Sequence, residues 1–115
     1  MELTVIRGDS YNLTFSLLKG NGNVLILSER DKCYFTVKKQ FEHEDCVIQK
    51  RYGTGIEYNE EKKVYSIKLN PCDTCDLKCG NYKFDIKVKL GDEIVKTLLR
   101  GTLILTNNAT HRCNE

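Results

Sequence analysis

The chain has 115 residues, 40% of them hydrophobic and 30% charged, which predicts one folded domain rather than a disordered chain. Its 18 Lys and Arg against 16 Asp and Glu leave a formal charge of +2. Because the basic residues are dispersed along the chain, the sequence gives no electrostatic case for a nucleic-acid partner. No apolar run approaches the roughly 20 residues that span a bilayer, and the first residues lack signal-peptide features. We therefore expect no membrane partner and synthesis in the cytosol.

The first half of the chain predicts short strands separated by glycine-containing turns. Apolar and polar residues alternate in segments 13–17 and 33–37, as expected for strands with one buried face, and residues 3–6 form a short apolar run. A brief apolar return at 24–27 and an ambiguous segment at 46–50 complete this half. Residues 7–10 and 19–23 carry the glycines and asparagines that favour chain reversals.

The second half begins with segments 56–58 and 64–69, which flank a charged connection of hairpin length. Residues 70–79 contain the only proline and predict a loop or helical turn. The strongest strand pattern is 80–90, in which five apolar residues alternate with four charged ones: Tyr82, Phe84, Ile86, Val88 and Leu90 against Lys83, Asp85, Lys87 and Lys89. Gly91-Asp92 predicts a tight turn into an antiparallel neighbour at 94–99, followed by a last strand at 102–106.

These patterns add up to about eight short strands, with no segment of sustained helical period. They predict an all-β fold, an antiparallel β-sandwich, with one domain at 1–106 and a loosely ordered tail at 107–115. Lysines are expected to discourage uncontrolled pairing at exposed strand edges, and the residues assigned this role are Lys87, Lys89 and Lys96.

Six cysteines are present, and without a signal peptide they are expected to be free thiols. Cys72, Cys75 and Cys79 are spaced closely enough to be candidate zinc ligands, with Cys113 as a fourth. Structural zinc sites usually offer two separated pairs of ligands, whereas this chain has one cluster. Ordinary cysteines without metal are therefore the preferred interpretation, and we expect no cofactor.

No pattern predicts catalysis. The two histidines, His43 and His111, lie in charged segments without a catalytic motif, and a pair of Cys46 with His43 is better explained as unrelated surface groups. The tripeptide beginning at Arg7 matches an integrin-binding motif, but a turn centred on Gly8 explains it more simply. Exposed aromatic residues could stack on a sugar, yet those left over from the predicted inward faces are scattered: Tyr11, Tyr34, Phe41, Tyr52 and Tyr58.

The order of local patterns is more informative than any single motif. The patterns are, in order, Val5-Ile6-Arg7-Gly8-Asp9-Ser10, Leu13-Thr14-Phe15-Ser16-Leu17, Tyr34-Phe35-Thr36-Val37-Lys38, Tyr65-Ser66-Ile67-Lys68-Leu69, Gly80-Asn81-Tyr82-Lys83-Phe84-Asp85-Ile86 and Gly101-Thr102-Leu103-Ile104-Leu105-Thr106. This succession, over about residues 4–110, resembles the small structural proteins of tailed phages and prophages of Gram-positive bacteria. The resemblance is to the amino-terminal domain of the baseplate upper protein family in particular.

The resemblance implies an immunoglobulin-like β-sandwich without catalytic activity that assembles into a baseplate, tail or head–tail junction through protein contacts. It further implies other virion subunits as partners, a homo-oligomer or ring, and location in the virion, with the bacterial host cytoplasm as the site of assembly. The cysteine-rich loop at 72–79 departs from the family pattern. The alternative function is a ligand-binding β-sandwich, either carbohydrate-binding or stabilised by zinc through Cys72, Cys75 and Cys79.

Overall fold

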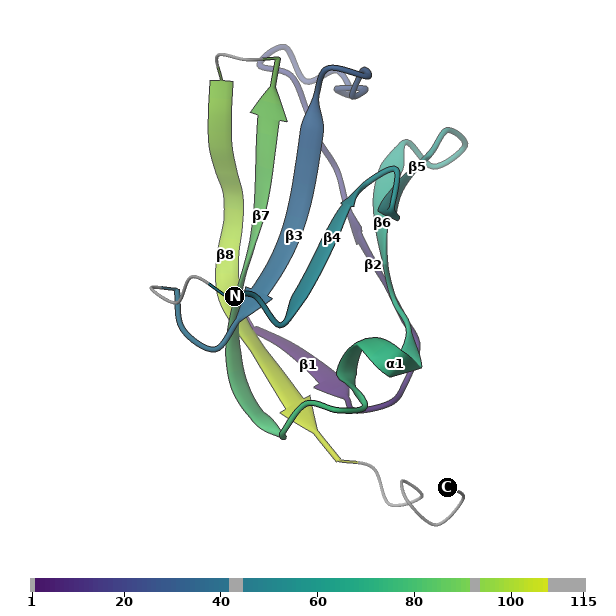
Figure 1. Cartoon of the computed structure of the whole chain (residues 1–115). Coiled ribbons are helices and arrows are strands. Elements are labelled where there is room, and N and C mark those ends of the chain that lie inside the picture. Colours follow the sequence, from purple (N-terminus) through teal and green to yellow (C-terminus); the bar gives the residue numbers. More distant parts are fainter. Residues whose placement is uncertain (1, 42–44, 92–93, 108–115) are drawn as a thin grey trace.

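The computed structural model describes residues 2–41, 45–91 and 94–107 and is nearly all-β (Figure 1). Its elements are β1 (Glu2–Ile6), β2 (Tyr11–Phe15), β3 (Lys32–Lys38), β4 (Ile48–Tyr52), β5 (Gly55–Asn59), β6 (Val64–Leu69), α1 (Pro71–Thr74), β7 (Gly80–Leu90) and β8 (Ile94–Thr106). The all-β class predicted from the sequence is therefore confirmed, and the only helix in the described part of the chain is one turn at the predicted place.

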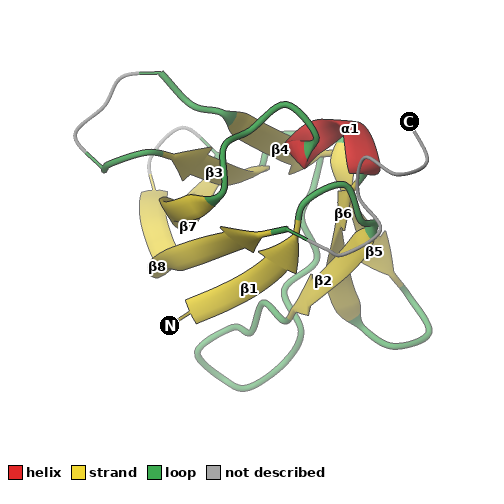
Figure 2. Cartoon of the chain, turned by 90° about the horizontal axis from the view of Figure 1, so that it is seen from below, coloured by secondary structure: helices red, strands yellow, loops and turns green. Residues whose placement is uncertain are grey.

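The eight strands form one continuous hydrogen-bonded sheet in the order β1-β8-β7-β3-β4-β5-β6-β2. The sheet curls until it is nearly barrel-shaped, with β1, β8, β7 and β3 on one side and β5, β6 and β2 on the other (Figure 2). The prediction of a purely antiparallel sheet is wrong for two pairs, because β1 runs parallel to β8 and β4 runs parallel to β5. The first of these pairs joins strands from opposite ends of the sequence.

The alternation in β7 is confirmed by burial. Tyr82, Phe84, Ile86 and Val88 are buried, whereas the charged residues between them face outward. The residues of β3 directly opposite on the inner face are Cys33, Phe35 and Val37, each fully buried. Burying one such large apolar side chain stabilises a fold by about 1.5–3 kcal/mol, so β3 and β7 provide the centre of the core.

The last two predicted strands, 94–99 and 102–106, are one strand of 13 residues, β8. Its pairing with β7 shifts by one residue next to Ile86 and Lys87, which leaves Leu98 as the extra residue of a β-bulge. The predicted return at 24–27 is not a strand, because it makes only the isolated bridge between Leu18 and Val24. Of the predicted tail at 107–115, only Asn107 is described.

One end of the fold, called the closed end here, joins β1 and the turn after it to the segment 70–79. Arg7 is buried, and its guanidinium donates a hydrogen bond to the carbonyl oxygen of Leu77 at 3.0 Å. The backbone N–H of Gly8 donates to the hydroxyl of the fully buried Thr74 at 2.9 Å. Gly8 has a φ of 86°, so the turn interpretation of the tripeptide is confirmed, and its arginine serves the fold.

An ion pair adds to the closed end. The Nζ of Lys50 lies 2.8 Å from a carboxylate oxygen of Asp73, and both side chains are largely shielded from solvent. Lys50 lies on the inner face of β4, opposite the core residue Phe35, so its side chain points toward α1. The same carboxylate caps α1 by accepting from the backbone N–H of Asn70 at 2.7 Å, so the short helix is anchored from two sides.

Candidate functional site

The opposite end, called the open end here, lacks a strand on each side of a gap. β1 pairs only with residues 102–106 of β8, so within the described residues the edge of β8 from 94 to 101 has no strand beside it. On the facing side β2 ends at Phe15, and the chain from 16 to 27 makes a single isolated bridge. The result is a cleft of about 570 Å³ between β8 and this segment.

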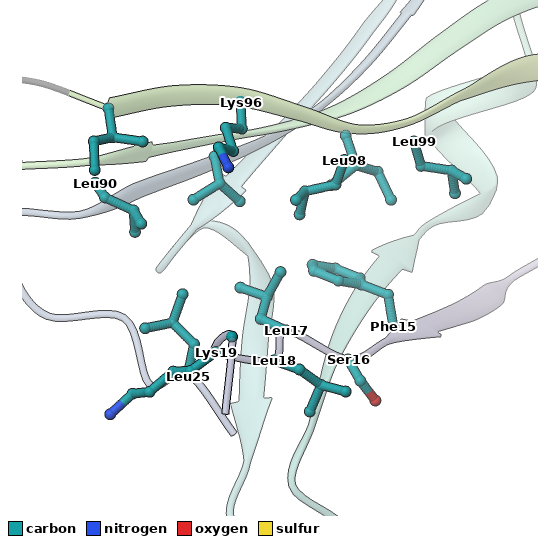
Figure 3. A pocket seen from close by; sticks show the side chains of 14 residues that line it. Phe15, Ser16, Leu17, Leu18, Lys19, Leu25, Leu90, Lys96, Leu98 and Leu99 are labelled. Carbon is teal, nitrogen blue, oxygen red and sulfur yellow. The ribbon is translucent and has the colours of Figure 1, made fainter. Parts of the chain in front are cut away.

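The walls of the cleft are mostly hydrocarbon. Leu90, Leu98 and Leu99 project from the β7–β8 hairpin toward Phe15 and Leu17 on the other wall (Figure 3). The rim continues this apolar character onto the surface with three side chains that are about half exposed or more: Leu18 at 61%, Ile94 at 47% and Leu98 at 45%. Large apolar side chains gathered at one exposed place are typical of an interaction surface.

Tyr65 of β6 holds the far wall in place. Its hydroxyl donates to the carbonyl oxygen of Leu25 at 2.8 Å and accepts from the backbone N–H of Leu27 at 2.9 Å. Its ring stacks on Phe15 with the centroids 5.4 Å apart. Burial raises the pKa of Tyr65, so the phenol stays protonated and able to donate. One buried residue therefore fixes a segment that has almost no strand pairing of its own.

A carboxylate ties the outer end of the hairpin to the preceding loop. Asp31 accepts hydrogen bonds from the backbone N–H of Ser28 at 2.9 Å and of Gly91 at 3.0 Å. The hydrogen bond from Ser28, followed by that from Gly91, lowers the pKa of Asp31. An ionised group thus holds Gly91, which follows the end of β7.

Two lysines, Lys19 and Lys96, also line the cleft. Lys96 lies opposite Val88 on the inner face and points into the gap (Figure 3). The predicted edge role of Lys87 and Lys89 is wrong, because β7 has β8 and β3 as neighbours on its two sides. Lys96 does lie on the free edge, and a charge turned inward there hinders uncontrolled pairing of strands.

The candidate zinc ligands are distributed over α1 and the loop after it. Cys72 and Cys79 are exposed, Cys75 is half-buried, and the Cys75 thiol lies 3.6 Å from the carbonyl oxygen of Cys72. In the described part of the chain, no three Cys, His, Asp or Glu side chains converge as a metal site requires. Cys113, like both histidines, falls outside the described residues.

The other two cysteines have different surroundings. Cys46, which the sequence analysis weighed as a partner of His43, is an exposed free thiol. Cys33 is fully buried in the core, and burial raises its pKa to about 11. A protonated, enclosed thiol is a poor nucleophile, so Cys33 serves packing.

The aromatic residues predicted to be scattered are partly gathered. Tyr58 and Tyr52 pack against Tyr65, with centroid distances of 4.9 and 5.8 Å. Both are half-buried, so they belong to an aromatic cluster around Tyr65 rather than to a flat surface that could stack on a sugar. Phe41 is used differently, because the guanidinium of Arg100 lies 4.0 Å from its ring centroid.

No protein-family model matches the chain, and no curated protein is significantly similar to it in sequence. Among the described residues, no helix has the length and apolar character needed to cross a membrane. The cleft and the outer faces of the sheet are therefore the features from which we infer function.

The sequence did not predict the cleft. Its walls come from segments that each look like ordinary short strands, and the gap arises only because a strand of five residues lies beside one of 13. The signal available in the sequence was the excess of apolar residues at 24–27 and 94–99, which exceeds what one buried face requires.

Proposed function

We propose that the chain is a non-enzymatic structural protein of a phage or prophage particle, a module of the baseplate, tail or head–tail junction that binds other protein subunits. The observation that carries this proposal is the apolar cleft at the open end, bordered by a strand edge that no other described strand covers. The resemblance of the sequence patterns to the baseplate upper protein family supports the choice of a virion. The protein would be located in the virion, after assembly in the bacterial host cytoplasm.

The strand order supports an immunoglobulin-like sandwich as the finer fold class. In that fold the strands C, F and G form one sheet, and B, E and D belong to the other. Here β3, β7 and β8 are neighbours in the order of strands C, F and G, and β2, β6 and β5 are neighbours in the order of strands B, E and D. The first strand lies beside β8 instead of β2, which is the main difference from the simplest version of the fold.

The partner that fits the open end best is an extended strand. The backbone N–H and C=O groups along the free edge of β8 can pair with such a strand, and its alternate side chains would enter the cleft. We assign this strand to the β8 edge of a second copy, paired antiparallel about a two-fold axis, because that arrangement turns the apolar rim of each copy toward that of the other. Leu98 lies at the centre of this contact.

The oligomeric state tests the proposal. Sedimentation equilibrium of the reduced protein over a range of concentrations should reveal a reversible dimer. Leu98→Asp, which places a charge at the rim, should weaken dimerisation at least about tenfold, as loss of a central contact residue does. Ile26→Asp is the matched control, since Ile26 is 61% exposed but does not line the cleft, and it should leave the dimer intact.

Two results would contradict this assignment. One is a protein that stays monomeric at every concentration, and the other is equal weakening by the two aspartate variants. Thermal unfolding of both variants checks that each is folded before its association is compared.

The second candidate function is a ligand-binding module, and the volume of the cleft favours it. Small-molecule sites commonly measure 300–1,000 Å³, which includes the 570 Å³ found here. The hydrocarbon walls suit an apolar ligand better than a sugar. Native mass spectrometry of the freshly purified protein would reveal a bound small molecule at one per chain if this candidate is correct.

A further inference from the structure

The outer face of the layer formed by β8, β7, β3 and β4 is a second surface of interest. It is charged, whereas the cleft walls are mostly apolar. Its charged residues come from all four strands and are placed together by the register: Lys32, Lys38, Arg51, Lys83, Asp85, Lys87, Lys89 and Arg100. Seven are cations and one is a carboxylate. This set, called the basic face here, has a formal charge of +6 in a chain of +2, so the remaining residues sum to −4.

The sequence-based argument against a nucleic-acid partner rested on the dispersal of these residues along the chain. Alternate residues of a strand share one face, and neighbouring strands place separate segments side by side (Figure 1). Dispersal in the sequence therefore becomes concentration on the surface. The expectation of no nucleic-acid partner loses its physical basis once the strand order is known.

The basic face places like charges directly opposite each other. In the β3–β7 ladder Lys32 lies across from Lys89, and Lys38 lies across from Lys83. Side chains in such positions are about 5 Å apart at Cβ, and like charges there destabilise a sheet. The cations that form no ion pair with any described residue are Lys32, Arg51, Lys83, Lys87, Lys89 and Arg100. The two lysine–lysine pairs do not serve stability, and an anionic ligand would offset their repulsion.

Lysine is the dominant cation of this face, which distinguishes between two kinds of anionic partner. Lysine is depleted at the centres of protein–protein interfaces, where arginine and aromatic residues are enriched. Phosphate backbones, in contrast, are commonly neutralised by lysine as a point charge. Five lysines among seven cations therefore favour a polyphosphate chain over an acidic protein surface.

The centre of the basic face offers a ring for stacking. Tyr34 points outward from β3, half-buried, with Lys87 opposite it on one side and Arg51 on the other. Beside it the Gln49 amide donates to the Thr36 hydroxyl at 3.3 Å, so hydrogen-bonding groups are also present. Cationic surfaces with an aromatic ring hold single strands, whose unpaired bases can stack. In the described residues this face has no helix or raised hairpin to enter the groove of a duplex.

We propose that the basic face binds single-stranded nucleic acid without strong sequence preference. The lysines of β3 and β7 neutralise the phosphates, and a base stacks on Tyr34. The loop that leads from β3 to β4 borders this face through Phe41, which packs on Arg100. This inference is independent of the proposed dimer, because it uses the outer face of the layer rather than the cleft.

Fluorescence anisotropy with a labelled oligothymidylate of about 20 nucleotides tests the proposal on the full chain. Binding should be saturable at 50 mM salt and about 50-fold weaker at 200 mM, if four phosphates are contacted. The double variant Lys87→Glu/Lys89→Glu should abolish binding. The control Lys62→Glu/Lys68→Glu changes the net charge equally on the other side of the fold and should retain most of it.

Tyr34 provides a test that does not change charge. Tyr34→Ala should weaken binding about 5- to 150-fold through loss of stacking, whereas Tyr34→Phe keeps the ring and should bind like the natural protein. Thermal unfolding should show that Lys87→Glu/Lys89→Glu is at least as stable as the unchanged chain, because Lys89→Glu removes the repulsion from Lys32.

Four outcomes would overturn the proposal. They are absence of binding up to about 100 μM protein at 50 mM salt, which is the weak limit of non-specific association; equal losses in the two double variants; tighter binding of a duplex than of the single strand; and equally effective competition by poly-glutamate. The last result would assign the basic face to an acidic protein instead.

Discussion

The two ends of the fold differ in whether the space between the two layers is covered. At the closed end β1 covers the edge of β8, and buried polar groups of Arg7 and Thr74 fasten the segment 70–79 across the opening. At the open end no strand covers β8 among the described residues, and leucine side chains line a cleft. The difference indicates that the closed end stabilises the fold, whereas the open end leaves apolar surface available to a partner.

The largest expected effect comes from one substitution made at both ends of the same strand. Leu103→Ala removes a side chain that is 1% exposed at the closed end and should lower the free energy of unfolding by about 2–5 kcal/mol. Leu98→Ala removes one that is 45% exposed and should change it by less than about 1 kcal/mol. Urea unfolding followed by circular dichroism measures both. Equal losses would show that the open end is packed as tightly as the closed end.

A smaller effect is expected at the wall of the cleft. Tyr65→Phe keeps the ring cluster but leaves the N–H of Leu27 and the carbonyl of Leu25 without their partner, which should lower the free energy of unfolding by about 1–3 kcal/mol. Amide hydrogen exchange should accelerate at Leu27 more than in β7. Tyr34→Phe on the outer face is the matched control. Unchanged exchange at Leu27 would mean that the segment is held by other contacts.

The smallest expected effect is the dependence of stability on low pH through Asp31. The hydrogen bonds from Ser28 and Gly91 lower the pKa of Asp31 from its ordinary value of 3.8, so folding favours the carboxylate. The resulting stabilisation is complete above the unfolded pKa and disappears as the pH falls through the lower pKa of the folded state. Asp31→Asn should remove this pH dependence and loosen the hairpin turn. The NMR titration of the Gly91 amide checks it, and an Asp31 pKa at or above 3.8 would contradict it.

Much of the fold could be predicted from local pattern. The alternation in 80–90 predicted which face of that strand is buried, and the glycines in 19–23 marked a real reversal. The join of 94–99 with 102–106 was not predicted, because Gly101 resembles a break although the strand continues through it opposite Phe84. The parallel pairing of β1 with β8 depends on contact between distant ends of the chain, which local periodicity does not encode.

The functional surfaces were harder to predict for the same reason. The cysteines at 72–79 were the most conspicuous residues in the sequence, yet in the described chain they do not converge. The cleft depends on unequal strand lengths, and the basic face depends on the order β8-β7-β3-β4. Both properties follow from which strands become neighbours, so residue spacing alone could not reveal them.

The bulge at Leu98 decides which set of side chains the free part of β8 offers to each side. With this extra residue, Ile94 and Lys96 lie opposite the inward-facing Leu90 and Val88, while Val95 and Thr97 face outward. Regular pairing without the bulge would place Leu98 opposite Lys87 and exchange the two sets, since side chains alternate along a strand. The lysine would then join the cations outside, and the interior would gain a valine and a threonine. The bulge therefore decides whether Lys96 lies in the cleft or on the outer face.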